Sequence, residues 1–306
     1  MSILVVGSVA FDRITTPFGT ADRCLGGSAT YFAVAASFFA PVNLVAVVGD
    51  DFTEEDVAIF KGRNINLDGL MKVKGAKTFF WSGEYGYDLN VAKTRETQLN
   101  VFADFAPRLN DAQRDSEVIF LANIDPNLQM DVLHQCRKPR LVALDTMNYW
   151  ISAKKEALTR AFQNVDLIVI NEAEVRQYTQ EPNLVKGCRQ ILALGGKTLV
   201  IKRGEYGVLM ITRDAVFAVP AYPLENVFDP TGAGDTFAGG FLGYLTSCRE
   251  HSDREFRRAI IFGSVLASFT VEKFSLDRLR EITLSDIHER YRAFRALTTF
   301  DDFEVD

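Results

Sequence analysis

Six short runs of valine, isoleucine and leucine recur along the chain, and each ends in polar residues or glycine. They are SILVVGS (2–8), VNLVAVVGD (42–50), VIFLANID (118–125), RLVALDT (140–146), DLIVINEAE (166–174) and TLVIKRG (198–204). Unbroken apolar runs of this length are typical of strands buried on both faces, as in a parallel sheet. Segments with helical periodicity lie between them, at 53–62, 128–137, 152–163 and 183–194. This alternation predicts an open, doubly wound α/β fold.

The polar residues that close these runs are predicted to meet at one edge of the sheet. They are Asp125, Asp145, Asn171, Glu174 and Lys202. In open α/β sheets, ligands bind beyond the carboxyl ends of the strands. We therefore expect these side chains to line a shared crevice.

Residues 70–105 depart from this alternation. They combine β-branched and aromatic residues with polar ones and glycines, which favours two or three antiparallel strands. Residues 13–25 add another strand. We expect a small β-rich lid, made of 13–25 and 70–105, inserted in an α/β core of 1–12, 26–69 and 106–306. An antiparallel edge of the main sheet is the alternative for residues 70–105.

Composition and charge exclude several classes of protein. With 47% hydrophobic and 24% charged residues the chain is typical of a globular protein, and intrinsic disorder is disfavoured. A net charge of -6 without a basic run argues against nucleic acid or a membrane surface as partner. The four cysteines are far apart, which indicates neither a zinc site nor disulfides. The N-terminus resembles no signal peptide, so we expect a cytoplasmic protein.

The segment DPTGAGDTFAGGF, 229–241, carries the strongest chemical signal. Pro230 fixes its own φ, whereas Gly232 and Gly234 permit backbone angles and close approaches that side chains forbid. Helical periodicity begins near Asp235, and further helices are expected at 253–272 and 285–297. Exposed amides at a helix N-terminus form a hole suited to a phosphate group.

Asp235 is unexpected beside a site for anions. It is either an acidic residue that favours the helix N-terminus, or a general base that accepts a proton from an attacking hydroxyl. The two roles are compatible. A P-loop and a GxGxxG dinucleotide motif are both absent from the sequence, so a hydride-transfer enzyme is poorly supported.

Three motifs together resemble the ribokinase/PfkB family of carbohydrate and nucleoside kinases. DPTGAGDTFAGGF resembles its C-terminal signature, LGGSATYFAVAASFF (25–39) its N-terminal glycine pair, and NEAE (171–174) its NxxE motif. The order and spacing also match, over nearly the whole chain. The resemblance implies a three-layer α/β/α domain with a mostly parallel sheet and a small β-rich lid.

The resemblance also implies roles for individual residues, most of them at strand ends. Asp235 would be the catalytic base, and Gly232, Ala233 and Gly234 would supply the amides of the anion hole. Asn171 and Glu174 would hold Mg²⁺ through water, while Thr231, Gly232, Gly234, Lys202 and Gly204 would lie near the ATP phosphates. Asp12, Gly26, Gly27, Ser28 and Thr30 would bind the acceptor together with Asp235, and Asp125 is a further candidate for this role from its strand-end position.

Several of these residues also have ordinary structural roles. Gly26 and Gly27 fit a turn before a helix, and Asn171 with Glu174 fits a helix cap. The stretch GGSATY replaces the GGKGAN pattern of ribokinase, which puts ribose itself in doubt. The segment 268–277 lacks a glycine common in the family, which leaves activation by K⁺ open.

These observations predict an ATP-dependent kinase that phosphorylates a hydroxyl, expected to be a primary one, of a sugar or a sugar-like polyol. A nucleoside kinase is the alternative, and a non-catalytic sugar or nucleotide sensor is the third hypothesis. The aromatic residues of the lid are Phe79, Phe80, Trp81, Tyr85 and Tyr87. They are expected to stack on a ligand, to form the core of the lid, or to join two lids in a homodimer.

Overall fold

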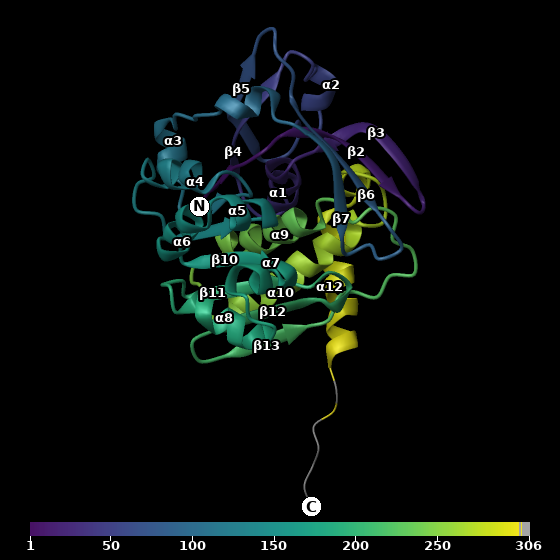
Figure 1. Ribbon diagram of the computed structural model, residues 1–306. Coiled ribbons are helices and arrows are strands. Elements are labelled where there is room, and N and C mark those ends of the chain that lie inside the picture. The colour runs from purple at the N-terminus through teal and green to yellow at the C-terminus, as the bar shows by residue number, and fades with distance from the viewer. Residues whose placement is uncertain (300, 302–306) are drawn as a thin grey trace, which may run out of the picture.

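The computed structural model describes residues 1–299 and 301 and contains two β-sheets (Figure 1). The larger sheet has the order β13-β12-β11-β10-β9-β8-β1-β4-β5. Its strands are β1 (Ile3–Val6), β4 (Val42–Gly49), β5 (Ile65–Val73), β8 (Val118–Leu121), β9 (Leu141–Asp145), β10 (Leu167–Asn171), β11 (Thr198–Lys202), β12 (Val208–Thr212) and β13 (Val216–Val219). All neighbouring pairs from β5 to β11 are parallel. Each of the six apolar runs therefore contains a strand of this sheet, as predicted.

Helices cover both faces of the large sheet and enclose two apolar cores. The helices on one face are α1 (Ser28–Ala36), α9 (Ala233–Ser247), α10 (Asp253–Thr270) and α12 (Leu284–Thr298). Those on the other face are α4 (Pro126–Leu133), α6 (Lys155–Gln163), α7 (Glu172–Thr179) and α8 (Leu184–Leu192). The shorter helices are α2 (Glu54–Val57), α3 (Asp111–Arg114), α5 (Asn148–Ala153) and α11 (Asp277–Glu281). The predicted three-layer α/β/α arrangement is confirmed.

Glycines allow α9 to lie directly against α1. A Cβ atom on Gly239 would lie 2.4 Å from the carbonyl oxygen of Phe32, and one on Gly243 would lie 2.8 Å from the Cα atom of Ala36. Any side chain at these positions would force the helices apart. This packing fixes the N-terminus of α9 relative to the N-terminus of α1.

The smaller sheet forms the lid and has the order β3-β2-β6-β7. Its strands are β2 (Ala10–Thr16), β3 (Gly19–Gly26), β6 (Phe79–Tyr85) and β7 (Ala92–Gln98), which lie together in Figure 1. The strands β2 and β6 pair in parallel, and the other two pairs are antiparallel. The lid is thus a separate sheet, and the alternative of an edge of the main sheet is wrong.

Two details of the predicted organisation need correction. The lid strand β2 begins at Ala10, and residues 70–73 belong to β5, because they continue to pair with β4 in the large sheet. The antiparallel edge formed by β12 and β13 was not predicted. Alternation in GVLMITRDAVFAV, interrupted at Arg213 and Asp214, is the signal that indicates this hairpin. Within the described residues, we find no helix whose length and apolar character would suit a membrane span.

Candidate active site

The N-terminus of α9 presents free amide groups at the carboxyl ends of the strands. Gly232 precedes the helix with a φ of 74°, a left-handed conformation that favours glycine. Among the described residues, the N–H groups of Gly232, Gly234 and Asp235 have no acceptor, whereas that of Ala233 donates to Pro230 at 3.2 Å. These unpaired amides and the helix dipole together suit an anion.

Asp229 holds this loop in place. Its side chain is fully buried and accepts hydrogen bonds from the N–H groups of Thr231, at 2.8 Å, and Ser275, at 2.9 Å. No role was predicted for Asp229 from the sequence, and this one was missed. The signal was an aspartate two residues before a glycine-rich turn, the spacing of an Asx turn.

Asp235 lies in the first turn of α9, half-buried, and its carboxylate accepts no hydrogen bond from the described residues. Burial and the charge of Asp145 raise its pKa to about 7, although the ammonium group of Lys202 acts in the opposite direction. A carboxylate with this pKa suits a general base near neutral pH.

The rate should therefore depend on pH through Asp235. A general base must be deprotonated, so we expect kcat/KM to fall about tenfold per unit below pH of about 7 and to level off above it. Initial rates measured from about pH 5 to about pH 9 would show this limb. A profile that stays flat across neutral pH would contradict the assignment of Asp235 as the base.

Lys202 and Asp145 form an ion pair across the strand ends. Their strands, β11 and β9, flank β10, and Lys202 Nζ lies 2.6 Å from Asp145 Oδ2. The exposed fractions of the two side chains are 19% and 3%. A Cβ atom on Gly234 would lie 3.2 Å from Lys202 Nζ, so the ammonium group lies against the first turn of α9.

Asn171 and Glu174 form a capping box on α7. Glu174 N–H donates to Asn171 Oδ1 at 2.8 Å, and Asn171 N–H donates to Glu174 Oε2 at 2.9 Å. The structural role considered for this pair is therefore present. Burial raises the pKa of Glu174 to about 7, although Lys202 lowers it. Glu174 Oε1 keeps no partner among the described residues, which leaves one carboxylate oxygen of this largely buried residue free for a ligand.

Asp12 lies on the lid, above the glycine pair. A Cβ atom on Gly26 would lie 1.9 Å from Asp12 Oδ2, and one on Gly27 would lie 2.4 Å from the carbonyl oxygen of Ser8. The Asp12 side chain is 4% exposed, and its carboxylate accepts no hydrogen bond within the described part of the chain. Burial, followed by the charges of Asp229 and Asp235, raises its pKa well above the usual range.

The other predicted acceptor residues make internal contacts. The Ser28 hydroxyl lies 3.2 Å from the hydroxyl of Ser8, and the Thr30 hydroxyl donates to the Gly26 carbonyl at 2.7 Å. Asp125 caps α4 and pairs with Lys154. No recorded contact joins Asp125 to Asp12 or Asp235 in residues 1–299 and 301.

Phe79, Trp81 and Tyr85 lie on one face of β6, the inner face of the lid, and Trp81 and Tyr85 are the two that lie beside the predicted site residues. Trp81 is the register partner of Asp12, so both side chains lie on the same face of the lid. Its ring covers Gly83, since a Cβ atom there would lie 2.0 Å from Trp81 Cη2. Tyr85 reaches the anion loop, where its hydroxyl accepts a hydrogen bond from Thr231 Oγ1 at 3.2 Å.

The remaining lid aromatics have other surroundings. Phe79 packs against Phe102 with ring centroids 5.6 Å apart, and Phe80 packs on the main core. The side chain of Tyr87 is 93% exposed. In the sequence, the only indication of which aromatic residues face inward is the alternation of side chains between the two faces of β6.

The turn between β6 and β7 closes over the far side of the crevice. Asn90 Nδ2 donates to Glu205 Oε1 at 3.0 Å, and Glu205 N–H donates to Asn90 Oδ1 at 3.3 Å. Gly204 has a φ of 55° and leaves room for Asn90, whose Oδ1 would lie 1.9 Å from a Cβ atom there. No local sequence pattern predicts this contact between the lid and the loop after Lys202.

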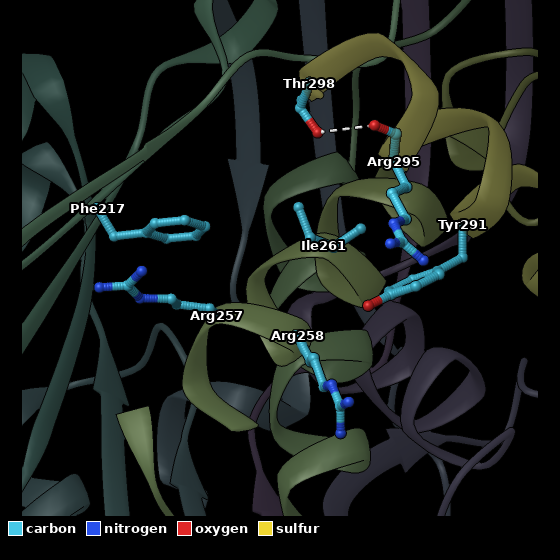
Figure 2. A pocket seen from close by; sticks show the side chains of 7 residues that line it. All are labelled: Phe217, Arg257, Arg258, Ile261, Tyr291, Arg295 and Thr298. Atoms are coloured by element: carbon cyan, nitrogen blue, oxygen red, sulfur yellow. Dashed lines mark hydrogen bonds between the residues drawn. The ribbon is translucent and has the colours of Figure 1, made fainter. Parts of the chain in front are cut away.

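Two cavities lie outside the crevice. A cavity of about 200 Å³ between α10, α12 and β13 is lined by Phe217, Ile261, Tyr291 and three arginines. Figure 2 shows the guanidinium group of Arg257 beside Phe217, with Cζ 5.1 Å from the ring centroid, and those of Arg258 and Arg295 apart from it. A second, of about 330 Å³, borders the face of the lid opposite to Asp12 and Trp81, near Phe11 and Phe80. Neither contains the strand-end residues described above.

Comparison with known proteins agrees with this arrangement. Residues 2–281 match the family described as pfkB family carbohydrate kinase. The cytidine kinase of Thermococcus kodakarensis is 30% identical over 252 residues, which cover 80% of this chain and 88% of that protein. The Burkholderia thailandensis nucleoside kinase, solved with inosine, superposes with a TM-score of 0.78 at 18% identity, over 95% of this chain and 97% of the other. An aminoimidazole riboside kinase from Salmonella enterica, solved with its riboside and an ATP analogue, gives a TM-score of 0.76 at 18% identity, over 95% and 100%.

Proposed function

Because this chain belongs to the pfkB family of carbohydrate kinases, we propose that it transfers a phosphoryl group from ATP to the primary hydroxyl of a ribose-containing compound. The observation that carries this proposal is the placement of two unpartnered carboxylates in one crevice. Asp12 lies on the lid side and Asp235 lies beside the free amides of α9. Burial chiefly raises the pKa of Asp12, and Asp235 is near enough for its charge to add to this effect. One carboxylate suits sugar hydroxyls, and the other suits the hydroxyl that reacts.

A nucleoside is the favoured acceptor among such compounds. Trp81 lies beside Asp12 on the inner face of the lid, and the indole N–H is held by Thr94 Oγ1 at 3.2 Å. With one face of its ring against Gly83, Trp81 offers the other face to a planar group. The relatives that act on nucleosides are consistent with this choice. A free sugar is the second candidate, supported by Asp12 and the glycine pair alone.

The groups in the crevice can account for each step of the phosphoryl transfer. The acceptor hydroxyl oxygen attacks the γ-phosphorus, the bond from that phosphorus to the bridging oxygen of ADP breaks, and Asp235 takes the hydroxyl proton. The amides of Gly232 and Gly234 hold phosphoryl oxygens, and the lid excludes water. Glu174, with its free Oε1, fits the water shell of a nucleotide-bound Mg²⁺, which would neutralise phosphate charge.

Turnover on a panel of acceptors tests this function. We expect ATP consumption with at least one nucleoside such as cytidine, adenosine or inosine, and weaker turnover with ribose. Turnover on free sugars alone would favour the second candidate. Binding of ATP and acceptor without any turnover would support a sensor and contradict the proposed kinase.

Substitution of Trp81 tests the nucleoside preference. We expect Trp81→Leu to raise KM for the nucleoside about tenfold, the equivalent of about 1.4 kcal/mol of stacking, and to leave KM for ribose unchanged. Trp81→Phe should retain most of the preference. Tyr87→Leu removes an exposed aromatic side chain from the same lid and serves as the control. Equal changes in KM for both acceptors would assign Trp81 to the lid core.

A further inference from the structure

Lys202 lies among three carboxylates at the strand ends. The chain places Asp145 on β9, Glu174 on α7 and Asp235 on α9 around it. Burial alone would lower the pKa of Lys202, but these three charges outweigh burial and raise the pKa. Lys202 therefore carries a permanent positive charge in a site that is otherwise acidic.

The ammonium group is also fixed in position. Asp145 is almost fully buried, its Oδ1 accepts a hydrogen bond from the Thr146 N–H at 2.8 Å, and its Oδ2 accepts one from Lys202 Nζ. Gln129 Nε2, which is itself buried, donates to the carbonyl oxygen of Asp145 at 2.9 Å. These contacts hold the carboxylate, and through it the lysine, with little freedom.

The ammonium group of Lys202 points toward the place where the phosphoryl group would be transferred. Its Nζ lies against Gly234, whose N–H is one of the unpaired amides of α9, and Asp235 follows in the chain. A phosphoryl group held by these amides would lie within reach of the ammonium group as well. Cations that are fixed before the reaction stabilise charge on the transferring phosphoryl group without reorganisation.

We infer that Lys202 binds a non-bridging oxygen of the phosphoryl group in transfer, and that Asp145 is a positioning residue that holds Lys202 against α9. This inference rests on the proposed kinase function. Lys202 keeps its proton throughout: the oxygen–phosphorus bond to the acceptor forms, the bond to ADP breaks, and the proton of the hydroxyl goes to Asp235. Asp145 contacts neither substrate and acts on the phosphoryl group through Lys202. Because its charge also raises the pKa of Asp235 to about 7, kcat of the Asp145 and Lys202 variants is compared at a pH of about 9, where Asp235 is ionised in all of them.

Replacement of Lys202 by methionine tests this role. We expect Lys202→Met to lower kcat about 10²- to 10³-fold, the usual loss when one fixed donor to a transition state is removed, while KM for ATP changes little. Lys197→Met is the matched control. Lys197 precedes β11 and pairs with Asp166 at 2.7 Å, at the other end of the same strands, and its side chain is 78% exposed. We expect that variant to keep full activity.

The role of Asp145 is tested with a double variant. If Asp145 acts through Lys202, Asp145→Asn should lower kcat, and Asp145→Asn combined with Lys202→Met should be no slower than Lys202→Met alone. The double variant also removes both buried charges, so it remains informative if Lys202→Met leaves Asp145 unpaired and fails to fold. Circular dichroism and binding of a non-hydrolysable ATP analogue verify the fold of each variant.

Three outcomes would overturn the inference. They are a kcat of Lys202→Met within about threefold of the wild type, a loss confined to KM for ATP, and additive losses in the double variant. The proposed function is tested separately, by turnover of the wild type on the acceptor panel. A wild type without turnover contradicts the kinase, whereas an active wild type with an equally active Lys202→Met contradicts only the role of Lys202.

Discussion

Asp235→Asn is expected to fold like the wild type and to lose turnover by about 10²- to 10⁴-fold, the range that general base catalysis contributes. Asparagine keeps the size of the side chain but cannot accept the hydroxyl proton. The substitution should leave the free energy of unfolding nearly unchanged or increase it, since burial and the charge of Asp145 already raise the pKa of Asp235 to about 7. Ionisation of Asp235 in the folded protein is therefore costly, and the variant avoids this cost.

The control for this variant separates catalysis from helix stabilisation. Asp253 occupies the first turn of α10, as Asp235 does in α9, and Asp253→Asn removes the same favourable interaction with a helix dipole. We expect Asp253→Asn to retain full kcat and to lose at most about 1 kcal/mol of unfolding free energy. Steady-state rates and urea unfolding of both variants give the comparison. Turnover of Asp235→Asn close to that of the wild type would remove Asp235 as the base.

Asp12→Asn is expected to raise KM for the acceptor about 100-fold, because a charged hydrogen bond to a sugar hydroxyl contributes about 1.5–3 kcal/mol. KM for ATP should change far less, since Asp12 lies on the lid above Gly26, whereas the free amides proposed to hold phosphate belong to the N-terminus of α9. Initial rates over acceptor and ATP concentrations separate the two effects. An unchanged KM for the acceptor would show that the unpartnered carboxylate of Asp12 has no ligand.

The same variant should be more stable than the wild type at neutral pH. The pKa of Asp12 is raised in the folded protein, chiefly by burial, so the folded state holds the proton more tightly than the unfolded state. The wild type consequently loses stability as the pH rises above the ordinary pKa of an aspartate. The gain from asparagine should be present at neutral pH and disappear below pH of about 4, which unfolding curves at both pH values would show.

Local patterns predict the sheet and the strand-end residues well. Each apolar run forms a strand because nearly every residue in it is buried on one face or the other, as in β4, where all eight residues are buried. The segment NEAE shows that a structural role of a motif leaves room for a proposed functional one. Asn171 and Glu174 cap a helix, and the cap orients the carboxylate whose Oε1 stays free.

Contacts between distant segments explain what the sequence does not predict. The parallel pairing of β2 with β6 joins two segments about 70 residues apart, and no local periodicity records it. The hydrogen bonds between Asn90 and Glu205 span 115 positions. Similarly, Lys202 and Asp145 were both expected at the strand ends, but their ion pair depends on β10 lying between their strands. Pairing of this kind is a property of the assembled sheet.

Because Asn90 in the lid contacts Glu205, the lid covers both ends of the crevice. The lid carries Asp12 and Trp81 on the acceptor side, and its turn rests on the loop that follows Lys202 on the donor side. For the proposed kinase we therefore expect closure over the acceptor to be the same movement as closure over the nucleotide. Thermodynamic linkage then requires reciprocity: whatever factor the acceptor adds to the affinity for ATP through this closure, ATP adds to the affinity for the acceptor.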